Sequence, residues 1–229
     1  MMKTPSAIMV FAAGFGTRMG ALTKDRPKPM VPLAGRPMID HALGLITDAG
    51  ITTIVANLHY KPDSLRAHLE PRGVALSEET PDVLETGGGL RHALPLLGDG
   101  PVFTMNPDAI WSGPNPLRAL AQAWDGEKMD ALLMCVPPDQ AIGRVGGGDF
   151  VMDADGRLSR GPGMIYGGAQ ILKTDLLATV PDRVFSLNVI WDQMLEQGRA
   201  YGLNHPGKWC DVGNPEGLKL AEAMVAQDV

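Results

Sequence analysis

The chain has 229 residues, of which 45% are hydrophobic and 20% are charged, and this composition predicts a folded chain with a sizeable buried core. Its formal net charge of −6 argues against general binding to nucleic acids or to an anionic membrane surface, while it leaves room for a local cationic pocket. The sequence shows neither a run long enough to span a bilayer nor a convincing secretory signal, so we expect a cytoplasmic protein.

The first predicted element is a buried strand over residues 7–13, which ends in the glycine-rich turn Gly14-Phe15-Gly16-Thr17-Arg18. Backbone N–H groups that are exposed in such a turn can bind phosphate. Two cations, Arg18 and Lys28, follow within reach of the same turn. This combination indicates a triphosphate site, and the alternative is an ordinary turn with surface cations.

The spacing of the turn excludes the two most familiar phosphate-binding loops. A Walker A loop carries Lys-Ser or Lys-Thr directly after its second glycine, whereas Thr17 and Arg18 follow Gly16 here. A dinucleotide-binding loop has a third glycine where this chain has Met19, and it opens a long helix. Four prolines within residues 27–37 exclude that helix, because proline lacks an N–H and clashes inside a helix. We therefore expect a long irregular loop that brings Lys28 back toward the phosphates.

Beyond this loop, predicted strands alternate with predicted helices. Helices are expected over residues 38–49, 62–69, 89–97 and 117–124. Strands are expected over residues 51–57, 74–76, 101–105 and 129–136. This alternation predicts an α/β fold with a Rossmann-like, mostly parallel sheet that has helices on both faces.

The C-terminal part of the chain has a different texture. Residues 143–168 are rich in glycine and turn signals, so we expect short antiparallel strands that form a lid or small side sheet. A helix over residues 186–196 could be capped by Ser186, and a last helix over residues 215–226 could be capped by Asn214. With no linker or internal repeat, residues 1–229 are expected to form a single domain.

The cysteines and histidines give no pattern of a zinc or redox site. Cys135 lies in an apolar run and is expected to be a buried strand thiol, and neither it nor Cys210 has a CxxC partner. None of the five histidines forms a pair with the spacing of a zinc motif. A reducing cytoplasm fits this usage.

Two carboxylates follow predicted strand ends, which is where open parallel sheets bind ligands. Asp108 follows the strand that ends near Met105, and Asp211 follows the aromatic segment at Trp209. Triphosphate chemistry usually needs Mg²⁺, which takes one or two carboxylates and keeps several waters. Singly, each aspartate is better explained as a helix cap or turn residue. Jointly, on an edge that carries a triphosphate loop, they indicate a metal site, with competitors in the turn-like segments at Asp149 and Asp153.

A second glycine-rich stretch, Leu84-Glu85-Thr86-Gly87-Gly88-Gly89, opens a predicted helix. It could let the backbone approach a flat base or a sugar closely, and a tight strand-to-helix connection explains it equally well. Whether Glu85 touches ligand is left open. Asn188 is either a polar contact to a ligand or an exposed helix residue.

Together these segments resemble the nucleotidyltransferases that make nucleotide sugars from a sugar 1-phosphate. The resemblance rests on residues 13–19 with 27–32, and it extends in order through residues 35–39, 84–89, 106–108 and 209–213. The short chain, without a C-terminal β-helix, is most similar to the N-acetylmuramate α-1-phosphate uridylyltransferases of cell-wall recycling. Mannose-1-phosphate guanylyltransferase-like proteins are close relatives of these.

The resemblance implies that an oxygen of the sugar phosphate attacks the α-phosphorus of UTP and that pyrophosphate leaves, with Mg²⁺ as the cofactor. It places Gly16, Thr17 and Arg18 on the triphosphate and Lys28 on the α-phosphate, so that Arg18 and Lys28 are the catalytic pair. It assigns Asp108 and Asp211 to the metal. The remaining residues that it implies are Ala13, Gly14 and Gly87 beside the base, and Ala109, Gly148 and Tyr166 beside the sugar.

One position departs from the family pattern, because Pro107 stands where the family usually has a glycine before the metal-binding aspartate. Proline fixes φ and lacks an N–H, so either the loop tolerates it, or metal affinity or sugar choice differs. Three alternatives to the uridylyltransferase stay open. They are a mannose-1-phosphate guanylyltransferase-like enzyme, a non-catalytic nucleotide-sugar sensor in which Pro107 marks a spoiled metal site, and a cytidylyltransferase for a non-sugar alcohol phosphate that shares the fold and the glycine turn. No protein partner is evident from the sequence.

Overall fold

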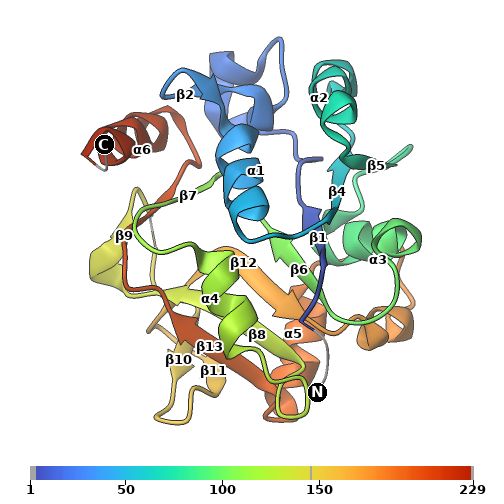
Figure 1. The fold of residues 1–229 in the computed structure, drawn as a ribbon, viewed down its shortest axis with the longest axis vertical. Coiled ribbons are helices and arrows are strands. Elements are labelled where there is room, and N and C mark those ends of the chain that lie inside the picture. Colours follow the sequence, from blue (N-terminus) through green and yellow to red (C-terminus); the bar gives the residue numbers. More distant parts are fainter. Residues whose placement is uncertain (1–3, 145, 228–229) are drawn as a thin grey trace.

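The computed structural model describes residues 4–144 and 146–227, and its centre is a seven-stranded sheet (Figure 1). In spatial order the strands are β13 (Ala200–Asn204), β8 (Ala131–Val136), β12 (Ile165–Leu172), β6 (Val102–Met105), β1 (Ala7–Val10), β4 (Thr53–Leu58) and β5 (Ala75–Glu78). Strand β12 runs antiparallel to β6 and β8, while the other neighbouring pairs are parallel. The predicted mostly parallel sheet is confirmed.

Helices cover both faces of this sheet, as the alternating pattern predicted (Figure 1). One face packs against α1 (Met38–Asp48), α2 (Pro62–Leu69) and α4 (Pro116–Ala123). The other face packs against α3 (Glu85–Leu97) and α5 (Asn188–Glu196). Successive side chains of β1 pack on opposite faces of the sheet. Ile8 lies in the core cluster that includes α1, α2 and α4, and Met9 lies in the cluster that includes α3 and α5. The last helix, α6 (Pro215–Gln227), packs on a third cluster beside the glycine turn.

Three small sheets surround the central one. The first has the order β7 (Ala109–Trp111), β14 (Trp209–Asp211), β9 (Ala141–Ile142), and the others are the pairs β10 (Phe150–Met152) with β11 (Leu158–Arg160) and β2 (Pro32–Leu33) with β3 (Arg36–Pro37). The predicted side sheet is thus confirmed at β10 and β11. The prediction was wrong at its end, because residues 165–168 belong to β12 of the central sheet. Glycines occur there because a Cβ on Gly167 would lie 2.4 Å from the Trp111 ring, and because Gly168 has φ +86°.

Helix α3 begins at Glu85, four residues before the predicted start at Gly89. The glycines are part of its first turn and pack against the chain that leads into α5. Gly87 and Gly88 both donate backbone hydrogen bonds to the carbonyl oxygen of Phe185, at 2.9 and 3.0 Å. A Cβ on Gly88 would lie 2.4 Å from the carbonyl oxygen of Arg183. These glycines therefore allow a close tertiary contact, in addition to any role near a ligand.

The predicted cap of the last helix and the buried thiol are confirmed, whereas the cap predicted for α5 is wrong. Asn214 caps α6, since its side-chain oxygen accepts from the N–H of Gly217 at 2.9 Å. Ser186 accepts from the N–H of Asn188 at 3.2 Å, but α5 begins at Asn188 with Leu187 at the cap position, so Ser186 lies one residue before the cap. Cys135 lies buried in β8, where burial raises the pKa of its thiol to about 12. A thiol with that pKa stays protonated at neutral pH and is unreactive.

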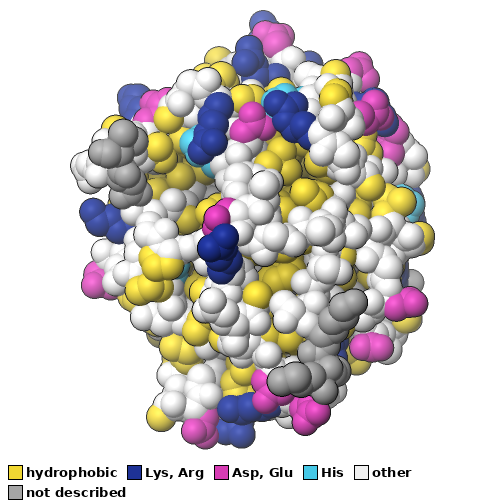
Figure 2. All heavy atoms as spheres, in the orientation of Figure 1, with side chains coloured by type: hydrophobic (Ala, Val, Ile, Leu, Met, Phe, Trp, Pro, Cys, Tyr) yellow, Lys and Arg dark blue, Asp and Glu magenta, His cyan; other side chains and the backbone are white. Residues whose placement is uncertain are grey.

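Charged side chains of both signs are mixed on the surface. On the face shown in Figure 2, lysine and arginine side chains are interspersed with aspartate and glutamate. In the described part of the chain, we find no helix with the length and apolar character needed to cross a membrane.

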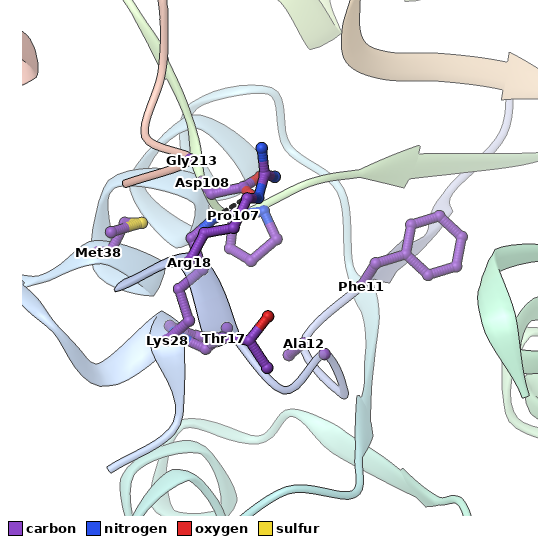
Figure 3. A pocket seen from close by; sticks show the side chains of 12 residues that line it. Phe11, Ala12, Thr17, Arg18, Lys28, Met38, Pro107, Asp108 and Gly213 are labelled. Carbon is purple, nitrogen blue, oxygen red and sulfur yellow. Dashed lines mark hydrogen bonds and ion pairs between the residues drawn. The ribbon is translucent and has the colours of Figure 1, made fainter. Parts of the chain in front are cut away.

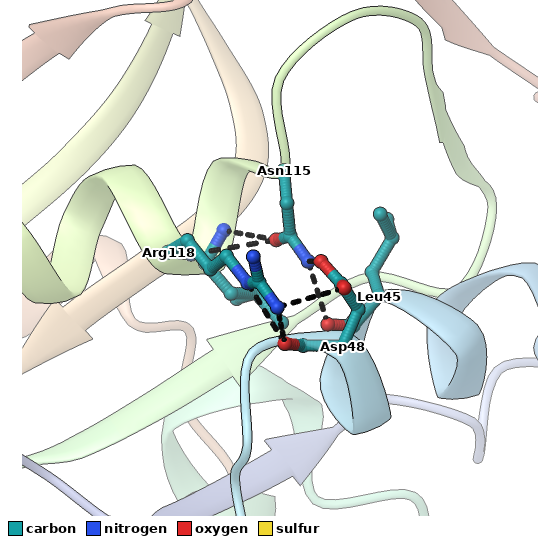
Figure 4. Close-up of polar contacts among 5 residues, drawn as sticks. Leu45, Asp48, Asn115 and Arg118 are labelled. Atoms are coloured by element: carbon teal, nitrogen blue, oxygen red, sulfur yellow. Dashed lines mark hydrogen bonds and ion pairs between the residues drawn. The ribbon is translucent and has the colours of Figure 1, made fainter.

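Helices α1 and α4 are joined by a polar cluster around Asn115 (Figure 4). The Asn115 side-chain oxygen caps α4 by accepting from the N–H of Leu117 at 2.9 Å. Its amide nitrogen donates to the carbonyl oxygen of Leu45 and to the Asp48 carboxylate, both at 2.8 Å. Arg118 adds a bond from Nε to the Asp48 carbonyl oxygen at 2.8 Å. The Asn115 side chain therefore hydrogen-bonds both to a backbone N–H at the start of α4 and to a backbone carbonyl near the end of α1.

We expect Asn115→Ala to lower the free energy of unfolding by about 1–2 kcal/mol, because it removes a helix cap and two interhelical hydrogen bonds. Chemical denaturation measures this loss. Asn204→Ala, at an exposed position of β13, is the matched control and should change the stability by less than about 0.5 kcal/mol. Equal losses in the two variants would contradict the role given to Asn115.

Candidate active site

The glycine turn after β1 is locked to the loop that carries Lys28. Gly16 has φ +61°, and a Cβ placed on it would lie 2.8 Å from the Lys28 Cβ. The Thr23 hydroxyl donates to the carbonyl oxygens of Gly16 and Gly20, at 3.1 and 3.2 Å. Only a short 3-10 helix, Thr17–Thr23, follows the turn, so the absence of a long helix is as predicted. The turn and Lys28 thus form one rigid unit.

We expect Gly16→Ala to destabilise the protein by at least about 1–2 kcal/mol, since a Cβ is strained at positive φ and would collide with Lys28. Gly14→Ala is the control, because the added Cβ at Gly14 meets no heavy atom within 4 Å. Its unfolding free energy should stay within about 0.5 kcal/mol of the parent. Thermal and chemical denaturation compare the two, and a Gly16→Ala variant as stable as Gly14→Ala would refute the locked geometry.

A cavity of about 210 Å³ opens between this turn and Asp108. Of the predicted site residues it is lined by Gly14, Gly16, Thr17, Arg18, Lys28 and Asp108. Figure 3 shows the Arg18 side chain extending past Pro107 toward Asp108 and Gly213. The Lys28 ammonium lies 2.5 Å from the Asp108 carboxylate, and the Lys28 side chain is only 13% exposed. The structure therefore brings the predicted phosphate-binding turn, both predicted cations and one predicted metal ligand into one cavity.

The second predicted carboxylate, Asp211, faces the same place from another element. The sequence suggested a strand end of the main sheet, whereas Asp211 ends β14 of the small three-stranded sheet, opposite Ala109 of β7. Burial raises the pKa of the Asp211 carboxyl, and the neighbouring charge of Asp108 raises it further. The Arg18 guanidinium lies over Gly213, where its nearest nitrogen is 3.2 Å from the position a Cβ would take. Two carboxylates are thus held close together next to the glycine turn.

This pair fits a hard cation such as Mg²⁺. Within residues 4–144 and 146–227, no group of three or more His, Cys, Asp or Glu side chains is placed to hold a metal ion. Mg²⁺ does not need such a cage, because it is commonly held by one or two carboxylates together with substrate phosphates and water. The partly buried charge repulsion between Asp108 and Asp211 is what a bound cation would relieve.

Pro107 is accommodated by a tight turn before Asp108. The N–H of Ala109 donates to the carbonyl oxygen of Asn106 at 3.3 Å, which closes a four-residue turn with Pro107 at its second position. Proline suits that position because its fixed φ is the one the turn requires. Pro107 is buried and Asp108 reaches the cavity from the next position. Of the two alternatives for this departure, the geometry favours a loop that tolerates proline.

A larger cavity of about 370 Å³ continues from the carboxylate pair toward α5. Of the three residues implied for the sugar, Ala109 and Tyr166 line it. Gly148 packs elsewhere, since a Cβ on it would lie 2.1 Å from the carbonyl oxygen of Gly163. Glu85 and Asn188, which the sequence left open, both line this cavity. Further lining residues that the sequence did not single out for a ligand are Arg144, Arg160, Gln170 and Trp191.

The floor of the larger cavity is a fixed polar chain. The Trp191 indole donates to the Gln170 side-chain oxygen at 2.9 Å, and the Gln170 amide donates to the Thr104 hydroxyl at 3.1 Å. Asp149, a competitor for the metal, instead accepts from the N–H of Tyr166 at 2.9 Å and from Arg144 at 3.1 Å. Each of the two carboxylate oxygens of Asp149 therefore already accepts a hydrogen bond within the protein. These bonds leave Asp108 and Asp211 as the better pair for a cation.

A third cavity, of about 350 Å³, lies on the other side of the glycine turn. Ala13, Gly14 and Phe15 line it together with Asn57 and Thr86. Gly87, which the resemblance places beside the base, lies one residue further into α3, where a Cβ would be 2.4 Å from the Phe185 ring. The glycine turn and the start of α3 therefore line one cavity, with Thr86 rather than Gly87 on its wall.

A buried pair that the sequence did not reveal holds this cavity's wall in place. Asn57, at the carboxyl end of β4, accepts from the N–H of Ala12 at 2.6 Å and donates to Glu79 at 2.7 Å. Glu79 also accepts from the N–H of Leu84 at 2.7 Å, and its side chain is buried. The signal that could have found Asn57 is a polar residue that directly follows the apolar residues 54–56 near the carboxyl end of a strand.

Comparison with known proteins gives a consistent result. Residues 8–155 match the model of the MobA-like NTP transferase domain. The N-acetylmuramate alpha-1-phosphate uridylyltransferase of Caulobacter vibrioides is 41% identical, over 99% of this chain and 100% of that protein. The protein of the same name from Neisseria meningitidis is 31% identical, over 94% and 96%. The solved structure of HddC from Yersinia pseudotuberculosis complexed with GMP-PN has a TM-score of 0.77 at 23% identity, over 96% and 99%, which shows a shared fold.

Proposed function

Because this chain belongs to the family of nucleotidyltransferases with a MobA-like NTP transferase domain, we propose that it transfers the uridylyl group of UTP to N-acetylmuramic acid 1-phosphate. Pyrophosphate is released, and the nucleotide sugar returns to cell-wall synthesis in the cytoplasm. The substrate choice rests on the full-length similarity to the Caulobacter enzyme. The observation that carries the activity is the meeting of Arg18, Lys28 and Asp108 in one cavity beside a larger chamber.

In this reaction an oxygen of the sugar phosphate forms a bond to the α-phosphorus, and the bond from that phosphorus to the bridging oxygen of the pyrophosphate breaks. The backbone of the glycine turn, with Thr17, holds the triphosphate. Arg18 stabilises the charge that develops on the leaving pyrophosphate, and Lys28 neutralises the α-phosphate. Such a transfer depends on positioning and charge stabilisation, because no covalent intermediate with the protein is required.

Asp108 and Asp211 would hold Mg²⁺, which when bound supplies positive charge between the carboxylates and the phosphates. Lys28 is paired with Asp108 in the substrate-free protein, at 2.5 Å. This pair keeps a partly buried ammonium solvated by a carboxylate until an α-phosphate arrives. In the proposed reaction Lys28 therefore pairs with the Asp108 carboxylate before the nucleotide binds and with the α-phosphate afterwards.

Pyrophosphate release tests the proposal directly, with UTP, CTP, GTP and ATP each offered at adequate Mg²⁺ with a panel of sugar 1-phosphates and phosphocholine. The expected result is the highest kcat/KM for UTP with N-acetylmuramic acid 1-phosphate. Turnover confined to CTP with phosphocholine would instead favour the cytidylyltransferase. No turnover with any pair, together with calorimetric binding of nucleotide sugar that does not depend on Mg²⁺, would favour the sensor.

A further inference from the structure

Three arginines line the larger cavity, and they differ in what already holds them. Arg18 lies over Gly213 at the phosphate turn. Arg144 pairs with Asp149 at 3.1 Å, and its charge opposes the rise in the pKa of Asp211 that burial causes, so it also acts near the carboxylate pair. Arg160, from the end of β11, contacts α5 instead. Arg160 is therefore the cation at the end of the chamber away from the proposed reacting phosphates.

The Arg160 guanidinium is held on one face and along one edge. Its carbon lies 4.8 Å from the centre of the Phe150 ring and 5.9 Å from that of Trp191. Nε and one Nη donate to a single oxygen of Asp192, at 2.9 and 2.7 Å, and the same Nη donates to Asn188 at 2.8 Å. Stacking on aromatic rings and a fixed acidic partner orient a guanidinium before a ligand arrives.

This arrangement leaves the second Nη of Arg160 available. Within the described residues, none accepts a hydrogen bond from that nitrogen, although the side chain lines the cavity and is 41% exposed. The guanidinium group is always charged and its nitrogens only donate hydrogen bonds, so the preferred partner of this nitrogen is an anionic oxygen. The phosphate of the sugar substrate has its own cations, Arg18 and Lys28, in the neighbouring cavity. An anion on the sugar itself would supply the missing hydrogen-bond acceptor for the second Nη of Arg160.

We propose that Arg160 binds a carboxylate carried by the sugar ring of the sugar 1-phosphate, and so selects an acidic sugar over its neutral counterpart. This inference rests on the proposed function and names the residue that reads the substrate. N-acetylmuramic acid carries such a carboxylate on its lactyl ether, and N-acetylglucosamine has the same ring without it. Asp192 and the Phe150–Trp191 rings act as positioning groups for Arg160.

The test compares kcat/KM for N-acetylmuramic acid 1-phosphate, its methyl ester and N-acetylglucosamine 1-phosphate, with UTP saturating. The parent enzyme should prefer the acid over the methyl ester by at least about tenfold. Arg160→Gln should lower kcat/KM for the acid by about 10- to 100-fold, mainly through KM, as expected for the loss of one charge-assisted hydrogen bond. The two neutral substrates should change by less than about threefold. Arg160→Lys, which keeps the charge, should recover part of the loss.

Arg157→Gln is the matched control, because Arg157 lies on the same hairpin, pairs with Asp155 at 3.0 Å and does not line the cavity. An unchanged KM for UTP shows that the Arg160 variants are folded. Equal losses for acidic and neutral substrates, or the loss appearing in Arg144→Gln instead, would overturn the assignment while the proposed function stands. A parent enzyme that uses none of these sugars refutes both the proposed function and the role of Arg160. The comparison of the acid with its methyl ester is made on the parent enzyme, so it does not depend on the folding of a variant.

Discussion

Lys28→Ala is expected to lower kcat by about 10²–10³-fold, the effect of removing one electrostatic group that acts on charge in the transition state. Lys28 is the right residue for such a loss because its side chain is only 13% exposed and lies at the cavity that the glycine turn lines. Steady-state pyrophosphate release measures the effect. An unchanged kcat would remove Lys28 from the mechanism.

Lys24→Ala is the control for Lys28→Ala, because Lys24 is an exposed lysine near the same turn and does not line the cavity. Its kcat should stay within about threefold of the parent value. The ion pair adds a second expected result. In Lys28→Ala, Asp108 loses its partner at 2.5 Å, so Mg²⁺ alone should raise the Tm more than it does in the parent protein.

Asp211→Asn is expected to lower kcat by at least about 10²-fold and yet leave the protein as stable as the parent or more stable. The loss of activity follows from the loss of a carboxylate ligand for Mg²⁺. The stability follows from the raised pKa of Asp211, because a carboxyl with a raised pKa is penalised in its charged form in the folded state. At pH 7, where Asp211 would otherwise be forced to carry that charge, the neutral amide removes the penalty.

The Asp211→Asn prediction is checked by pyrophosphate release together with thermal unfolding in EDTA and in Mg²⁺. Mg²⁺ should raise the Tm of the parent and have a much smaller effect on the variant. Asp153→Asn is the control, since Asp153 is an exposed turn residue that accepts from the N–H groups of Asp155 and Arg157, as an asparagine oxygen also can. A variant that keeps full activity, or keeps the full Mg²⁺ shift, would contradict the metal role.

Local sequence signals predicted most helices well. The bounds of α2 are those expected, because Pro62 opens the helix and the buried residues Leu65 and Leu69 are four positions apart on one face. Helix α1 begins at Met38 as expected and ends before Gly50, which has φ +72°. Such caps and periodicities act within a few residues, so they can be read without knowing the fold.

The errors occurred where a distant segment decides the local structure. The glycines at the start of α3 looked like a loop, but their backbone packs on Phe185, about a hundred residues away in the chain. The glycines of β12 looked like part of a lid. They belong instead to the central sheet, where the missing side chains make room for Trp111 of β7 and for Asn106. In both places the intrinsic preference of glycine gave way to tertiary packing.

The sequence by itself determined the segment that we propose to hold the triphosphate, because the glycine turn and Lys28 lie within one short segment that has little conformational choice. Only the tertiary structure decided the proposed sugar end. Arg160 comes from β11 and its acidic partner from α5, 32 residues later, and Asn57 supports Ala12 across 45 residues. Contacts of that range depend on how the sheet and its helices pack, which spacing in the chain does not encode. The turn therefore pointed to the nucleotidyltransferase family, while the proposal of an acidic sugar rests on the cavity beside the turn.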